Sequence, residues 1–175
     1  MSPSESSTPI PKYFTVCPRK LVVMNLVTFG GYGLYWVFSH WLHHGSLNPD
    51  KRIWPLWRTL FRVLFWRTLF KEFKQAAQRL NVNVGWGPTR YAIVMVLLFF
   101  WTRGIERYIP YGSLYLSMFF LIRLIESYVL SQVQTTVNLV NQDPDAERNR
   151  QYTLINWVFL ALGAGLWWLN ILEVV

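Results

Sequence analysis

Few side chains in this sequence are spaced for chemistry, and the first group is a set of histidines. His40, His43 and His44 stand at i, i+3 and i+4, so a continuing helix would direct imidazoles along one face, as metal or haem ligation requires. No acidic residue or fourth ligand follows at a suitable spacing. We therefore expect no metal and no cofactor, and we interpret these histidines as titratable residues at a helix end.

The second group combines charge and amide chemistry in one apolar segment. Arg123 and Glu126 are three residues apart, where an ion pair would lower the cost of placing both charges in a membrane. Further along, Gln134, Asn138 and Asn141 share one helical face. In one interpretation, these charged and amide side chains pair with other groups of the protein and have only a structural role. The alternative is a polar path for a proton, ion or small substrate, lined by these five residues.

Signals for an enzyme are weak. The serines have no histidine nearby in the sequence, no nucleophile elbow occurs, and no acidic pair shares a helical face. Gly30, Gly31 and Gly33 do not form a phosphate-binding loop, because no strand precedes them and no lysine follows. We expect no catalytic residues, and a membrane enzyme or metal-binding protein that uses the histidines is the weakest alternative.

Composition places the chain in a membrane. Hydrophobic residues make up 53% of the 175 positions, and aromatic residues (18%) outnumber charged ones (15%). In soluble domains charged residues outnumber aromatic ones. The net charge of +8 is compatible with nucleic-acid binding, but no nucleic-acid motif appears and most basic residues flank apolar runs. That placement indicates retention of positive charge on the cytoplasmic side, so we expect no nucleic-acid partner.

The apolar runs predict an all-α, polytopic integral membrane bundle. A polar tail at 1–12, without a signal-peptide core, precedes a single helical membrane domain at 13–175. Runs long enough to cross a bilayer predict four transmembrane helices, at about 20–41, 89–105, 111–130 and 153–172. The third is expected to project beyond the bilayer, because its pattern becomes amphipathic after Arg123.

An arginine-rich segment at 53–80 is helical in character but costly to insert in lipid. We predict an interfacial or half-embedded helix that contacts the headgroups of anionic lipids through Arg58, Arg62, Arg67, Lys71 and Lys74. If residues 53–70 cross the membrane instead, there are five spans and the N-terminus changes side. In both topologies the positive-inside rule makes the loops Lys71–Arg90 and Asp143–Arg150 cytoplasmic.

Small residues in two apolar runs predict close helix packing. In TFGGYGLYW (28–36), glycines remove side-chain bulk, so that another helix can approach or this helix can bend. Ala161 and Gly165 form a small-residue face in the last run, suited to packing within the chain or between copies. We therefore expect a bilayer rich in anionic lipid as one partner, and another membrane protein or a second copy as the other.

Three ordered blocks resemble a family of bacterial inner-membrane proteins without an assigned activity. The first block, T-x-G-x-Y-x-x-Y-W, comprises Thr28, Gly30, Tyr32, Tyr35 and Trp36. The second comprises Ile53, Pro55, Trp57, Arg58 and Phe61. The third comprises Val133, Gln134, Val137, Asn138, Asn141, Pro144, Asn149, Tyr152, Asn156 and Trp157. This chain departs from the family pattern at Phe38, Ser39 and His40, where the family tends to have Tyr-Lys-Asn.

The resemblance implies a multi-pass protein of the bacterial inner membrane and names no reaction. The predicted helix packing and contact with anionic lipid favour a small structural or accessory subunit of a membrane complex. A small transporter or channel is the leading alternative.

Overall fold

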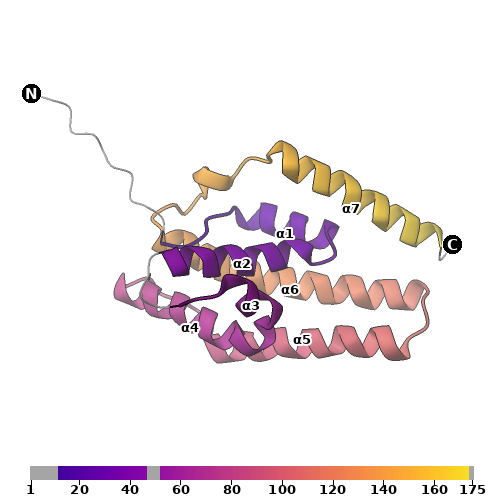
Figure 1. Cartoon of the computed structure of the whole chain (residues 1–175), viewed down its shortest axis with the longest axis horizontal. Helices are drawn as coiled ribbons and strands as arrows, with labels where there is room; N and C mark the ends of the chain where they lie inside the picture. The colour runs from indigo at the N-terminus through magenta and orange to yellow at the C-terminus, as the bar shows by residue number, and fades with distance from the viewer. Residues whose placement is uncertain (1–11, 47–51, 174–175) are drawn as a thin grey trace, which may run out of the picture.

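The computed structural model describes residues 12–46 and 52–173 and contains only helices as regular elements within them. Prolines open three of these helices, at the position where the missing N–H is not needed. The elements are α1 (Pro18–Val27), α2 (Gly31–Ser46), α3 (Pro55–Leu60), α4 (Arg62–Arg79), α5 (Pro88–Tyr108), α6 (Ser113–Val140), the short 3₁₀ helix η1 (Glu147–Asn149) and α7 (Leu154–Leu172) (Figure 1). The all-α prediction is confirmed. The predicted tail lies outside the described residues except for Lys12.

The predicted helix over 20–41 is wrong, because the chain reverses in its middle. Phe29 and Gly30 have φ angles of 55° and 88°, and the left-handed conformation ends α1 and sends α2 back alongside it (Figure 1). Side chains accept hydrogen bonds from backbone N–H groups just after the turn. The Thr28 hydroxyl accepts from the Tyr32 N–H at 2.9 Å, and Asn25 Oδ1 accepts from the Gly33 N–H at 2.8 Å. Residues 18–46 therefore form the hairpin α1–α2.

The arginine-rich segment is also two helices rather than one. The chain bends at Phe61, between α3 and α4. One face of α4 is buried against α5 and α6. That face carries Trp66, Leu69, Phe70, Phe73, Ala76 and Ala77.

The core lies at one end of the molecule. α5 and α6 run antiparallel side by side, and α6 also packs against α1 and α4 (Figure 1). The buried positions of α6 all lie between Ile122 and Val140, where the helix meets the hairpin α1–α2 and the segment before it. The first part of α6 is surrounded by few other elements. The longer, C-terminal part of α6 is thus a core helix, while its first part presents apolar side chains outward.

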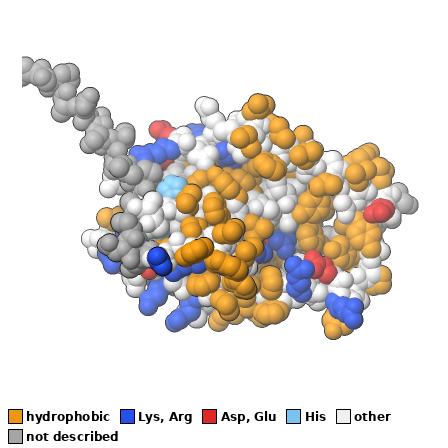
Figure 2. Space-filling view, in the orientation of Figure 1, with side chains coloured by type: hydrophobic (Ala, Val, Ile, Leu, Met, Phe, Trp, Pro, Cys, Tyr) orange, Lys and Arg blue, Asp and Glu red, His pale blue; other side chains and the backbone are white. Residues whose placement is uncertain are grey.

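Two described helices, α6 and α7, are long and apolar enough to cross a membrane. α5 begins and ends close to the predicted span 89–105, but it does not meet the same criterion of length and hydropathy. Large hydrophobic side chains are exposed along α3, α4, α5, α6 and α7, with Leu154 of α7 80% and Leu64 of α4 74% accessible. Figure 2 shows hydrophobic side chains over much of one face. The described part of the chain therefore has two candidate spans, and the predicted four are not established.

Candidate functional site

A buried ion pair lies where α6 meets the tip of the hairpin α1–α2, which is the turn at Phe29 and Gly30. Arg123 Nη1 and Glu126 Oε2 are 2.6 Å apart, and the two side chains are only 12% and 10% exposed. Arg123 Nη2 also donates to the Thr102 hydroxyl of α5 at 3.0 Å. The predicted i, i+3 pair is thus formed, and a neighbouring helix completes it.

The hairpin tip covers this ion pair closely. A Cβ atom added at Gly30 would collide with Arg123 Nη1, the same nitrogen that pairs with Glu126. Gly30 also has φ 88°, a conformation that L residues rarely adopt. Glycine is therefore required at this position for two separate reasons, and of the predicted packing glycines this one contacts the charged centre. Gly33 instead packs against Asn25, while Gly31 has only ordinary contact with Thr28.

Two further arginines gather on the other side of the pair. Arg62 opens α4, Arg103 lies on α5, and both guanidiniums are 5.7 Å from the centre of the Phe99 ring. Together with Arg123 and Glu126 they line a cavity of about 50 Å³. Arg103 was not predicted as a site residue, and its charge just after the apolar run 91–101 is the signal that marks it.

The arginines influence one another electrostatically. Burial lowers the pKa of the Arg62 guanidinium, and the Glu126 carboxylate raises it. The charges of Arg123 and Arg103 lower this pKa again, so three guanidiniums share one electrostatic environment. Arginine keeps its proton even so. We refer to Arg62, Arg103 and Arg123 below as the arginine cluster.

The predicted polar stripe holds the N-terminal segment in place. Gln134 Nε2 donates to the Phe14 carbonyl at 3.1 Å, Asn138 Nδ2 to the Val16 carbonyl at 3.0 Å, and Asn141 Nδ2 to the Tyr13 carbonyl at 2.7 Å. Gln134 Oε1 accepts from Trp36 as well. All three amides are buried, at 4% exposure or less. The amide groups of the stripe are therefore occupied by hydrogen bonds to backbone carbonyls. They do not form a polar path that continues from the ion pair.

The histidines do not converge on a common point. His40 is fully buried among the rings of Tyr13, Phe14, Trp36 and Phe73, and its Nε2 lies 3.3 Å from Gln134 Oε1. His43 Nδ1 bonds the Ser39 carbonyl, and His44 packs against Trp41. Burial lowers the pKa of His40 to about 3, so it is neutral rather than a titratable interfacial residue. Among the described residues no group of His, Cys, Asp and Glu is arranged to hold a metal ion.

The basic residues predicted to meet lipid headgroups have differing surroundings. Arg58 stacks on the Trp41 ring at 4.3 Å, Arg67 donates weakly to Thr89 at 3.4 Å, and Lys74 to the Trp86 carbonyl at 3.4 Å. Lys71 is exposed. Arg62 belongs to the arginine cluster. Headgroup contact is thus sterically open to Lys71 and Arg67, whereas the other three are also attached to the fold.

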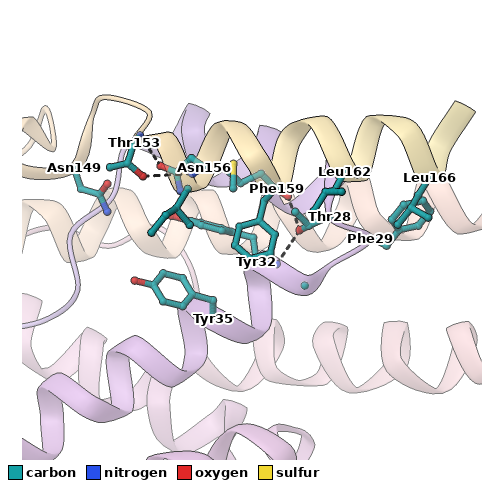
Figure 3. A pocket seen from close by; sticks show the side chains of 14 residues that line it. Thr28, Phe29, Tyr32, Tyr35, Asn149, Thr153, Asn156, Phe159, Leu162 and Leu166 are labelled. Carbon is teal, nitrogen blue, oxygen red and sulfur yellow. Dashed lines mark hydrogen bonds between the residues drawn. The ribbon is translucent and has the colours of Figure 1, made fainter.

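A second, larger cavity separates α7 from the hairpin α1–α2. It has a volume of about 700 Å³, and Figure 3 shows Thr153 and Asn156 toward one end and Leu162 and Leu166 toward the other. α7 is attached by Gly163, which packs on the Val27 carbonyl, and by Trp167, which stacks on Phe29 at 4.5 Å. The predicted small residues Ala161 and Gly165 both face outward, so Gly163 provides the packing within the chain.

No family model, curated protein or solved structure matches this chain.

Proposed function

We propose that this chain is a multi-pass protein of the bacterial inner membrane that acts as a structural or accessory subunit of a membrane complex. One observation carries the proposal: α7 is apolar except for Asn156 and Asn170, yet Gly163 is its only buried residue. A helix with this composition needs lipid or another helix around it. The T-x-G-x-Y-x-x-Y-W signature, which resembles an inner-membrane family, supports the same location.

The outer face of α7 is suited to another membrane helix. Ala161 and Gly165 are exposed and one turn apart, on the side of the helix opposite to Gly163. Without side-chain bulk at these positions, a second backbone can approach closely, which is the main way that helices associate in lipid. The cavity beside α7 gives the helix room to adjust when a partner binds. The partner in this proposal is a transmembrane helix of another membrane protein.

We propose a topology with α5, α6 and α7 crossing the bilayer and the hairpin α1–α2 entering it from one side. The start of α5, the end of α6 and the start of α7 lie at the same end of the molecule, which also carries the loops rich in Lys and Arg (Figure 1). The positive-inside rule makes that end cytoplasmic. This topology has three spans instead of the four predicted from the sequence, because the first predicted span is the hairpin α1–α2.

The partner proposal is tested by copurification from native membranes after cross-linking. The wild-type chain is expected to retain a specific membrane protein, and Gly165→Leu is expected to lose it because the larger side chain holds the partner helix away. Ala164→Leu, an exposed substitution on a neighbouring part of α7, is the matched control and should retain the partner. A wild-type chain that purifies alone, or equal retention in both variants, contradicts the proposal.

The position of the hairpin tip favours transport as a second candidate. Broken helices that meet buried charges are typical of substrate and ion sites in transporters. Here the tip lies on the Arg123–Glu126 pair. Flux of protons or ions into liposomes containing the purified chain, abolished by Glu126→Gln, would support this candidate. Liposomes with no flux above the protein-free background would exclude it for the ions tested.

A further inference from the structure

The arginine cluster carries more positive charge than its own carboxylates neutralise. Arg123 pairs with Glu126, and Arg103 pairs with Glu106 at 2.7 Å on the exposed side of α5. Arg62 makes no ion pair or hydrogen bond with the described part of the chain. Arg123 Nε is buried and also lacks a partner there. Unpaired guanidinium groups in a site of low polarity are expensive, so an additional anion would stabilise them.

The cavity between these arginines is sized for one small group. Its volume is about 50 Å³. A cavity needs about 10–15 Å³ of such volume to hold one water molecule, so this one has room for a small group of several non-hydrogen atoms and not for a lipid chain. Trp66, Met95 and Leu98 form its apolar wall, which strengthens every electrostatic interaction inside. Guanidinium groups match oxyanions best, because each can donate two parallel hydrogen bonds.

We propose that this cavity binds a single phosphate group, held by Arg62 and Arg123, with Arg103 at its entrance. Glu126 orients Arg123, and Thr102 holds the other end of the same guanidinium. A phosphate group reaches the cavity either as the headgroup of an anionic phospholipid or as free phosphate. The lipid source rests on the membrane placement proposed above. The exposed side chains of Leu64, two residues after Arg62, and of Leu97, next to Leu98 in the sequence, support it.

Binding is measured on the purified full chain in a non-ionic detergent, by native mass spectrometry and by thermal unfolding. Three probes are added separately: phosphatidylglycerol, phosphatidylcholine with the same acyl chains, and inorganic phosphate. We expect phosphatidylglycerol to bind at one site per chain and to raise the unfolding temperature more than phosphatidylcholine does. Saturable stabilisation by inorganic phosphate, absent with chloride at the same ionic strength, would identify the free ion as sufficient.

Arg62→Gln is the decisive variant, and Arg107→Gln on α5 is its control. Losing a charge-assisted bidentate contact should weaken binding about tenfold or more. Arg107 is exposed and outside the cavity, so its substitution removes the same charge and should leave affinity unchanged. Arg62→Lys keeps the charge without the two-pronged geometry and should give an intermediate affinity.

The proposal is overturned if neither phosphatidylglycerol nor phosphate binds the wild type, or if the Arg62 and Arg107 variants lose affinity equally. If Arg62→Gln does not fold, the wild-type titrations with the three probes and the folded Arg62→Lys variant still decide. Because binding is measured on the isolated chain, its outcome is independent of whether a protein partner exists.

Discussion

Replacing Gly30 by alanine tests whether the hairpin tip and the buried ion pair depend on each other. The substitution adds a Cβ at φ 88°, in contact with Arg123 Nη1. The left-handed backbone costs about 1–2 kcal/mol for an L residue. Removing a partner from a buried ion pair costs about 3–5 kcal/mol, but the Arg123 guanidinium ends a flexible side chain and keeps part of the pair after shifting. We expect a total loss of about 2–5 kcal/mol.

Gly31→Ala is the matched control in the same turn. A Cβ at Gly31 would lie 3.6 Å from Thr28, an ordinary contact, and the residue is the first of α2. Alanine is a better helix former than glycine by up to about 1 kcal/mol, so this substitution should be neutral or stabilising. The assay is reversible unfolding of the purified chain in mixed micelles, followed by circular dichroism.

A double-mutant cycle then separates the two costs. In a background with Arg123→Ala and Glu126→Ala, the collision is gone, and Gly30→Ala should cost only the backbone part, about 1–2 kcal/mol. The reasoning is refuted if Gly30→Ala costs the same in both backgrounds, or if it changes stability no more than Gly31→Ala does.

Three further substitutions test the core, the N-terminal segment and α7. The pKa of His40 is about 3 in the folded chain, below its unfolded value of about 6.5. The free energy of unfolding should therefore fall by about 1.4 kcal/mol per pH unit as the pH drops below about 6.5. In His40→Phe, the unfolding temperature measured across that range should depend less steeply on pH. Asn138→Leu removes one of the three amide hydrogen bonds that hold the N-terminal segment and leaves the buried Val16 carbonyl without this donor, at a cost of about 1–3 kcal/mol. Limited proteolysis should then cleave that segment faster. Gly163→Ala brings a Cβ against backbone that cannot yield and should destabilise the chain by about 1–3 kcal/mol, whereas Gly165→Ala should be neutral in thermal unfolding.

The long helices are predictable from the sequence because apolar runs and breakers coincide. α7 begins and ends within a residue of the prediction, since Thr153 opens it with a capping box and the apolar run continues to Leu172. The extension of α6 to Val140 also follows from its amphipathic pattern. Local signals of this kind act over one or two turns, and no knowledge of the tertiary structure is needed to read them.

The hairpin α1–α2 was not predicted, for an equally local reason. An uncharged apolar run of sufficient length is typical of one crossing helix, and Phe29, which takes φ 55°, is not a residue that marks turns. The glycines allow a bend, but the reversal depends on Asn25 and Thr28, which accept hydrogen bonds from the first N–H groups of α2. That role is visible only when both helices are in place.

The candidate site was predicted in part. The Arg123–Glu126 pair follows from spacing along one helix, whereas Arg62 and Arg103 join it from helices distant in sequence. The amides after Glu126 have the spacing of a polar path, yet they bind backbone carbonyls of the N-terminal segment. A polar stripe is equally suited to lining a path and to binding an extended strand of chain, and the sequence alone does not distinguish them.

The hydrogen bonds made by the N–H groups of the hairpin turn decide what the site can bind. In broken helices that bind anions, the free N–H groups at a helix start supply the attraction. Here the N–H groups of Gly31, Tyr32 and Gly33 already have acceptors, in the Thr28 carbonyl, the Thr28 hydroxyl and the Asn25 amide oxygen. The start of α2 is therefore saturated, and any anion near the tip must be held by the guanidiniums below it. For this reason neutralising Arg62 should weaken specific phosphate binding about tenfold or more even though the turn stays intact.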